Sequence, residues 1–139
     1  MTGTAVPPIT PRGEEARYYE RLRAHEVTYQ GCADCDSVIF PLRTVCPGCG
    51  SESLEDRVSS GRGSIHSFTT QHRAGHPLLA DRVPYTLVLV DLDEGFRVMA
   101  DLPGVDPESV AVGQSVEAWF DDIDERLTVL RFRRAGEDS

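Results

Sequence analysis

The sequence predicts a mainly β protein: a short N-terminal helix, then a small ribbon built on cysteines, then a closed five-stranded barrel. Three observations predict this order. A helical pattern occupies residues 10–25, all four cysteines form two C-x-x-C pairs between residues 32 and 49, and five segments of strand-like composition follow. We expect three parts, at residues 1–26, 27–58 and 59–139.

Composition limits the class of protein before any motif is considered. With 139 residues and 40% apolar content, the chain can build one core. It has no run near the ~20 apolar residues of a membrane span and no visible signal peptide, so we expect a cytoplasmic protein with no membrane partner. A formal charge of −9 repels phosphate backbones, which argues against nucleic acid as the main partner.

The N-terminal helix is predicted from its first turn. Thr10 can cap it with Pro11 at the first position, and Glu14 and Glu15 suit the positive end of the helix dipole. We expect it to run to about His25. Its short apolar stripe is Tyr18, Tyr19 and Leu22. The stripe can dock on the chain's own domain or on another subunit, and its small size favours the second.

The stretch from Cys32 to Gly50 predicts a metal site. Cys32 pairs with Cys35 and Cys46 with Cys49, with ten residues between the pairs. Each C-x-x-C turn brings two sulfurs to the same ion, and four sulfurs complete a closed tetrahedron. A redox dithiol needs only one such pair, and two disulfides need an oxidising compartment. The spacing therefore favours a structural zinc ribbon, with iron in the same cage as the alternative.

The strands follow from composition and turn residues. In the ribbon we expect strands at 27–31 and 37–42, with Ile39 and Phe40 packing between the cysteine pairs, and a link at 51–59. Barrel strands are expected at 64–71, 85–92, 96–102, 115–121 and 127–133, with a helical turn at 107–110. Five strands with their longest connections after the first and third are typical of an OB-type barrel. The second barrel strand is apolar on both faces, so we expect both to be covered.

The loop at residues 72–84 joins the first two barrel strands. OB folds often use this loop for ligands. In an acidic protein it places Arg73 and Arg82, with two histidines, beside Leu78 and Leu79. A binding loop and a solvated loop are both compatible with this composition.

The remaining polar and aromatic residues have structural explanations. We expect His66 to be a satisfied structural histidine. Trp119 and Phe120 are expected to form core and groove wall, since a stacking platform for single-stranded nucleic acid comes with a basic groove. A solvated hairpin tip is expected, in preference to a cation site, for the acidic cluster of Asp121, Asp122, Asp124 and Glu125.

The order of helix, ribbon, S-G-R-G-S-I-H-S-F-T, P-Y-T-L-V-L-V-D-L-D-E-G-F-R-V-M-A and V-G-Q-S-V-E-A-W-F resembles the family once called domain of unknown function 35. The similarity spans residues 10–134. It implies a rubredoxin-like zinc ribbon joined to an acyl-CoA-associated OB fold. It also implies an accessory subunit whose partner, a thiolase-superfamily enzyme or sometimes a hydratase, carries the catalytic residues.

Three classes of function therefore stay open. The first is a non-catalytic partner subunit, with Arg73 and Arg82 near the coenzyme A arm. The others are a nucleic-acid-binding ribbon and barrel, which the charge disfavours, and an iron electron carrier, which visible absorption would reveal. For the first class, the apolar residues expected at the interface are Tyr18, Tyr19, Leu22, Ile39, Phe40, Leu78 and Leu79.

Overall fold

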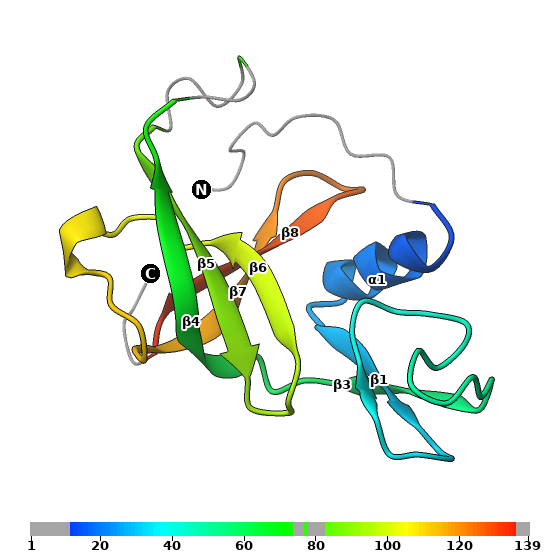
Figure 1. Cartoon of the computed structure of the whole chain (residues 1–139). Coiled ribbons are helices and arrows are strands. Elements are labelled where there is room, and N and C mark those ends of the chain that lie inside the picture. Colours follow the sequence, from blue (N-terminus) through cyan, green and yellow to red (C-terminus); the bar gives the residue numbers. More distant parts are fainter. Residues whose placement is uncertain (1–11, 74–76, 78–82, 136–139) are drawn as a thin grey trace.

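The computed structural model describes residues 12–73, 77 and 83–135 (Figure 1). Its elements are α1 (Glu14–Arg23), β1 (Thr28–Cys32), β2 (Val38–Ile39), β3 (Leu54–Val58), β4 (Arg62–Gln71), β5 (Tyr85–Leu92), β6 (Arg97–Asp101), the 3-10 turn η2 (Pro107–Ser109), β7 (Ser115–Asp122) and β8 (Thr128–Arg134). The expected mainly β architecture is confirmed. No helix within the described ranges is long and apolar enough to cross a bilayer.

The ribbon is a three-stranded antiparallel sheet in the order β2-β1-β3. β3 pairs with β1 along its whole length, where the sequence predicted only a link. Its side chains are mostly exposed and polar, so it lacks the apolar alternation that marks a strand. The buried side chain of Gln30 extends the sheet, because its amide donates to the Arg43 carbonyl and accepts from the Arg43 N–H.

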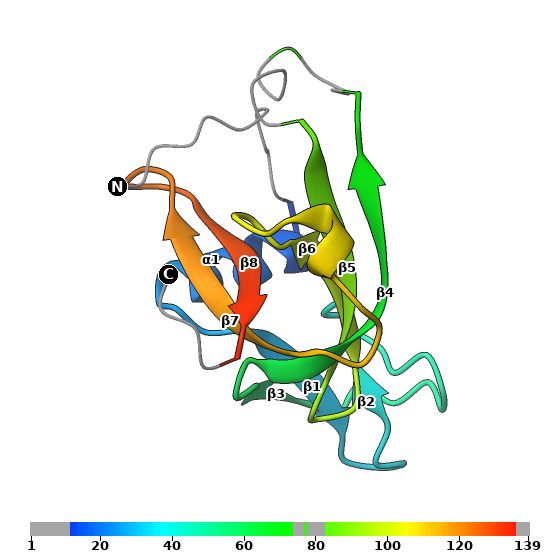
Figure 2. The ribbon, with the colours of Figure 1, turned by 90° about the vertical axis from the view of Figure 1, so that its left-hand side faces the viewer.

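The second sheet is a closed barrel in the order β4-β5-β6-β8-β7 (Figure 2). Its strands begin and end within two residues of the positions expected from composition. All pairings are antiparallel except that of β6 with β8, which closes the barrel through the pair Asp101 and Arg131. The second barrel strand, β5, alternates between buried and half-buried residues. The inner face is covered as expected, whereas the outer face is only half-buried within this chain.

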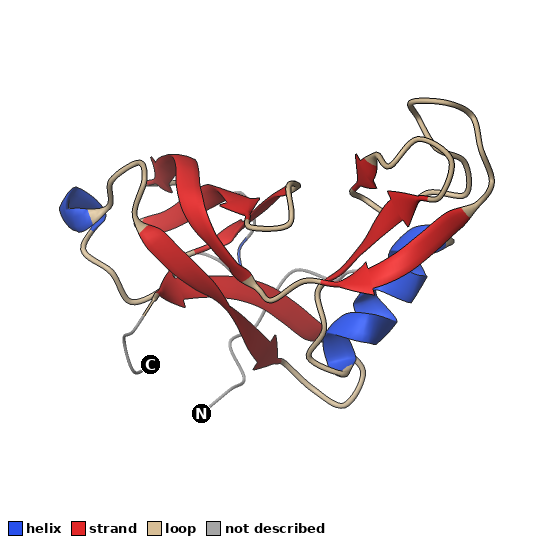
Figure 3. Ribbon diagram, turned by 90° about the horizontal axis from the view of Figure 1, so that it is seen from below, coloured by secondary structure: helices blue, strands red, loops and turns tan. Residues whose placement is uncertain are grey.

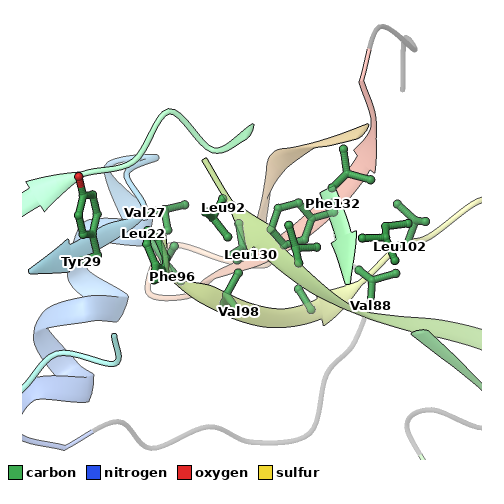
Figure 4. Close-up of a cluster of buried hydrophobic side chains, with 14 of the residues drawn as sticks. Leu22, Val27, Tyr29, Val88, Leu92, Phe96, Val98, Leu102, Leu130 and Phe132 are labelled. Atoms are coloured by element: carbon green, nitrogen blue, oxygen red, sulfur yellow. The ribbon is translucent and has the colours of Figure 1, made fainter. Parts of the chain in front are cut away.

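One apolar core joins the ribbon to the barrel (Figure 4). Leu22 of α1 and Val27 at the start of the ribbon are each 1% exposed and pack with the barrel interior. The ring of Tyr29 in β1 stacks on Phe96 beside β6 at a centroid distance of 4.8 Å. The two lobes seen from below in Figure 3 are thus held together by shared side chains.

The helix packs against its own chain. It begins after Gly13, and Thr10 and Pro11 lie outside the described residues. Tyr18 meets the ring of Phe40 edge to face at 5.4 Å, and Leu22 is buried. Part of the apolar stripe that we expected on another subunit therefore packs within the chain, while Tyr18 and Tyr19 stay half-buried.

Candidate functional site

The four cysteines converge on one point at the end of the ribbon. Their sulfur atoms all lie within 4.8 Å of one another. The Sγ atoms of Cys32 and Cys49 are 3.6 Å apart, and so are those of Cys35 and Cys46. A disulfide would require about 2.05 Å. The edges of a tetrahedron with zinc–sulfur bonds of 2.3 Å are roughly 3.8 Å, so the arrangement fits one four-thiolate metal ion.

The backbone of the second cysteine pair favours thiolates. Burial opposes ionisation of Cys46, but the N–H groups of Cys49 and Gly48, together with the sulfurs of Cys35 and Cys32, outweigh it and lower the pKa of this thiol to about 6. The Ser51 amide also favours the Cys49 thiolate. The neighbouring sulfurs of Cys35 and Cys32 outweigh that amide and raise the pKa of Cys49 to about 12. A central cation would remove this opposition, so the donor set is suited to a metal ion.

The ribbon positions its metal ligands with short turns. Gly48 lies inside the second turn and its N–H donates to the Cys46 sulfur at 3.3 Å. The Ser37 hydroxyl lies 3.0 Å from the Cys35 sulfur. Cys32 and Cys46 are buried, whereas Cys35 and Cys49 are exposed. With four protein ligands, the ion would have no open position for a substrate.

A buried charge cluster on the barrel was not predicted. The Arg131 guanidinium donates to Asp121 through Nε at 2.7 Å and to Asp101 through Nη1 at 2.6 Å. All three residues are at most 8% exposed. The expected solvated tip is therefore wrong for Asp121. A charged residue directly beside large apolar residues, as in M-A-D-L, W-F-D and V-L-R-F, was the available sequence signal.

A second acidic residue of the hairpin contacts the helix end. His25 Nε2 lies 3.0 Å from both carboxylate oxygens of Asp122, and its ring stacks on Phe120 at 5.0 Å. The Thr128 hydroxyl donates to Asp122, and this bond, with the imidazole, lowers the pKa of Asp122. Asp124 stays in the turn and accepts from two backbone N–H groups.

Other predicted residues lie apart from the thiol cluster. His66 is exposed on the barrel surface, where Asp91 and Arg97 contact its ring, so it has polar partners, as expected of a structural histidine. Arg73 is exposed just after β4. Arg82, Leu78 and Leu79 lie outside the described residues.

A groove of about 520 Å³ lies between α1, the segment after β2, and the strands β6 and β8. Several expected interface residues line it. They are Tyr18, Tyr19, Leu22 and Phe40. Ile39, by contrast, is 2% exposed and packs beside the buried cysteines. The sequence predicted the helix residues of this groove as interface residues, but it did not predict the contribution of β6 and β8.

A four-cysteine ribbon followed by a closed five-stranded barrel places this chain in the class of proteins that join a cysteine ribbon to an OB fold. Family models agree along the chain: residues 20–55 match the rubredoxin-like zinc ribbon domain of ChsH2, and residues 56–121 match its C-terminal OB-fold domain. Relatives with these features are named DUF35 domain-containing proteins, and this chain belongs to that family.

Three curated relatives illustrate the similarity. A DUF35 domain-containing scaffold protein of Methanothermobacter thermautotrophicus is 35% identical over 69% of this chain and 72% of its own length. A probable enoyl-CoA hydratase alpha subunit of Thermomonospora curvata is 31% identical over 88% of this chain but only 38% of its own length. The benzoylsuccinyl-CoA thiolase subunit BbsA of Thauera aromatica is 33% identical over 62% of this chain and 57% of its own length.

A solved structure matches nearly the whole chain. It is a chain of the Ltp2-ChsH2(DUF35) aldolase, which is 31% identical and superposes with a TM-score of 0.80. The match covers 93% of this chain and 99% of that one. By contrast, the chain spans little more than a third of the hydratase alpha subunit.

Proposed function

We propose that this chain is a non-catalytic subunit that binds and scaffolds a thiolase-superfamily enzyme acting on acyl-CoA thioesters. The observation that carries the proposal is the match, at 31% identity, to 99% of a chain of the Ltp2-ChsH2(DUF35) aldolase. Relatives named as a scaffold protein and a thiolase subunit support the same role.

The chemistry of the chain supports an accessory role. Its thiols are directed at one another in a cluster that a metal would close, and this leaves no open coordination site. We propose zinc as the ion and structure as its role. We also propose the cytoplasm as its compartment, where thiolate ligands stay reduced. The scaffold would therefore leave acyl-CoA chemistry to its partner.

Co-expression with a thiolase-superfamily protein encoded beside this chain tests the proposal. We expect the two proteins to co-elute in size-exclusion chromatography and the partner's turnover to depend on the complex. The isolated chain should have no turnover on any acyl-CoA. Separate elution at micromolar concentration, or robust thioester chemistry from the chain alone, would contradict the proposal.

A further inference from the structure

The groove between α1 and the barrel has an apolar floor. Phe40 and Leu42 contribute from the segment after β2, Val98 and Ala100 from β6, and Leu130 from β8. These side chains are buried or partly buried in the chain's own core, so the floor is fixed by packing. A preformed apolar surface binds a partner without the entropy cost of ordering it.

An exposed methionine lies at the edge of this floor. Met99 is 64% exposed, although it lies in the middle of β6. Its cross-strand neighbour Leu89 is on the same outer face of the barrel and is half-buried. The apolar surface therefore continues from the groove onto the β5–β6 face, and exposed apolar surface of this kind marks interaction sites.

The charge at the groove distinguishes between possible occupants. Glu14 and Glu15 line it at the first turn of α1, and the protein carries a net charge of −9. Acidic side chains repel the phosphates of a coenzyme A thioester and a second copy of the same acidic chain. They attract lysine and arginine, which steer association and fix register at an interface.

We propose that this groove receives a segment of the partner enzyme that inserts apolar side chains beside Met99 and places Lys or Arg against Glu14 and Glu15. This proposal rests on the proposed function and names the docking surface and the chemistry of its occupant. Apolar anchors give such an interface its affinity, and the acidic edge gives its salt dependence.

Two pairs of matched variants test the proposal in the complete chain with the same thiolase-superfamily partner. Met99→Glu adds a charge in the groove, and Val112→Glu adds it at a 66% exposed valine that does not line the groove. Glu15→Lys reverses a charge in the groove, and Glu20→Lys reverses one on the same helix outside it. All four positions are exposed, and unchanged melting temperatures would show that the variants fold.

We expect Met99→Glu and Glu15→Lys each to raise Kd by about tenfold or more, and the two controls to change it by less than about twofold. The effect of Glu15→Lys should shrink at high salt. If wild type forms the complex and all four variants bind equally, the groove assignment is wrong while the scaffold role stands. If wild type forms no complex, both proposals fall.

Three further outcomes would assign the groove to another occupant and overturn the proposal. One is saturable binding of dodecanoyl-CoA by the chain alone that Met99→Glu abolishes. Another is a wild-type dimer in light scattering that the same variant dissociates. The third is greater hydrogen exchange at the groove when residues 1–11 are removed, which would indicate that the chain's own N-terminal segment occupies it.

Discussion

Position 63 has no room for a side chain, because the backbone of β5 lies too close. A Cβ at this position would lie 2.3 Å from the backbone carbonyl oxygen of Asp91 in β5, and backbone in a paired strand cannot move aside. Gly61, two residues earlier, has φ of +79°. The G-R-G motif is therefore explained by the geometry at the start of β4.

Gly63→Ala should lower the free energy of unfolding by about 3 kcal/mol or more, because the barrel must open at β4 and β5. Gly31→Ala is the matched control. There the atoms nearest to the new Cβ belong to the guanidinium of Arg57, which can swing away. Urea unfolding of both variants measures the difference, and equal losses would show that close backbone approach is not the cause.

Arg131 holds a charge cluster that breaks if one partner is lost. Arg131→Met leaves Asp101 and Asp121 buried without their shared cation, which should cost about 3–5 kcal/mol. Arg97→Met removes an exposed arginine paired with Asp91 and should cost less than about 1 kcal/mol. Thermal unfolding compares the two. Similar melting temperatures would mean that the buried cluster contributes no more than a surface pair.

At the scale of elements, the turn between β5 and β6 anchors the link from ribbon to barrel. Glu94 accepts a hydrogen bond from the Ser59 hydroxyl at 2.6 Å and another from the Ser60 N–H at 2.8 Å. Gly95, with φ of +101°, makes the turn possible. The E-G motif thus fixes where the chain passes from one sheet to the other.

This anchor predicts a pH dependence. Burial alone would raise the pKa of Glu94, but its bonds to Ser59 and Ser60 outweigh burial and lower that pKa. A lowered folded-state pKa means that the stabilisation is complete above the ordinary pKa of glutamate and is lost as pH falls through the folded-state value. Glu94→Gln should flatten the acidic limb of the stability curve. An unchanged limb in urea unfolding between about pH 3 and 6 would contradict the anchor.

Metal removal should act first on the ribbon. Zinc analysis of the pure protein should give about one ion per chain, and a chelator should unfold the ribbon, because metal binding and folding share one free energy. Circular dichroism and the melting temperature measure this loss of ribbon structure. A metal-free chain that keeps its melting temperature would refute a structural role, and visible absorption would indicate iron instead of zinc.

At the scale of the whole molecule, helix, ribbon and barrel share one core, so the proposed partner would meet a single preformed body. Arg73 lies just after β4, at the start of the loop in which the sequence places Arg82. We keep the proposal that these arginines contact the phosphates of coenzyme A in the assembled complex.

Replacing both loop arginines by alanine should raise the KM of the complex more at low salt than at high salt, since screened charge contacts weaken with ionic strength. A matched control replaces Arg43 and Arg126, two exposed arginines elsewhere, and should leave KM unchanged. Equal KM values for both double variants at low salt would mean that the loop is a solvated connection with no role in binding.

The sequence by itself determined the cysteine cluster, the barrel strands and the family, because these depend on spacing, period and turn residues that are local in the chain. Tertiary structure alone decided which polar groups are buried and which apolar groups stay exposed. Asp101 and Arg131 meet across 30 positions, and His25 and Asp122 across 97. β3 is a strand because β1 pairs with it, and the groove exists because α1 folds back beside β8. No local pattern encodes such contacts, because strand order and helix docking bring together residues that the sequence separates.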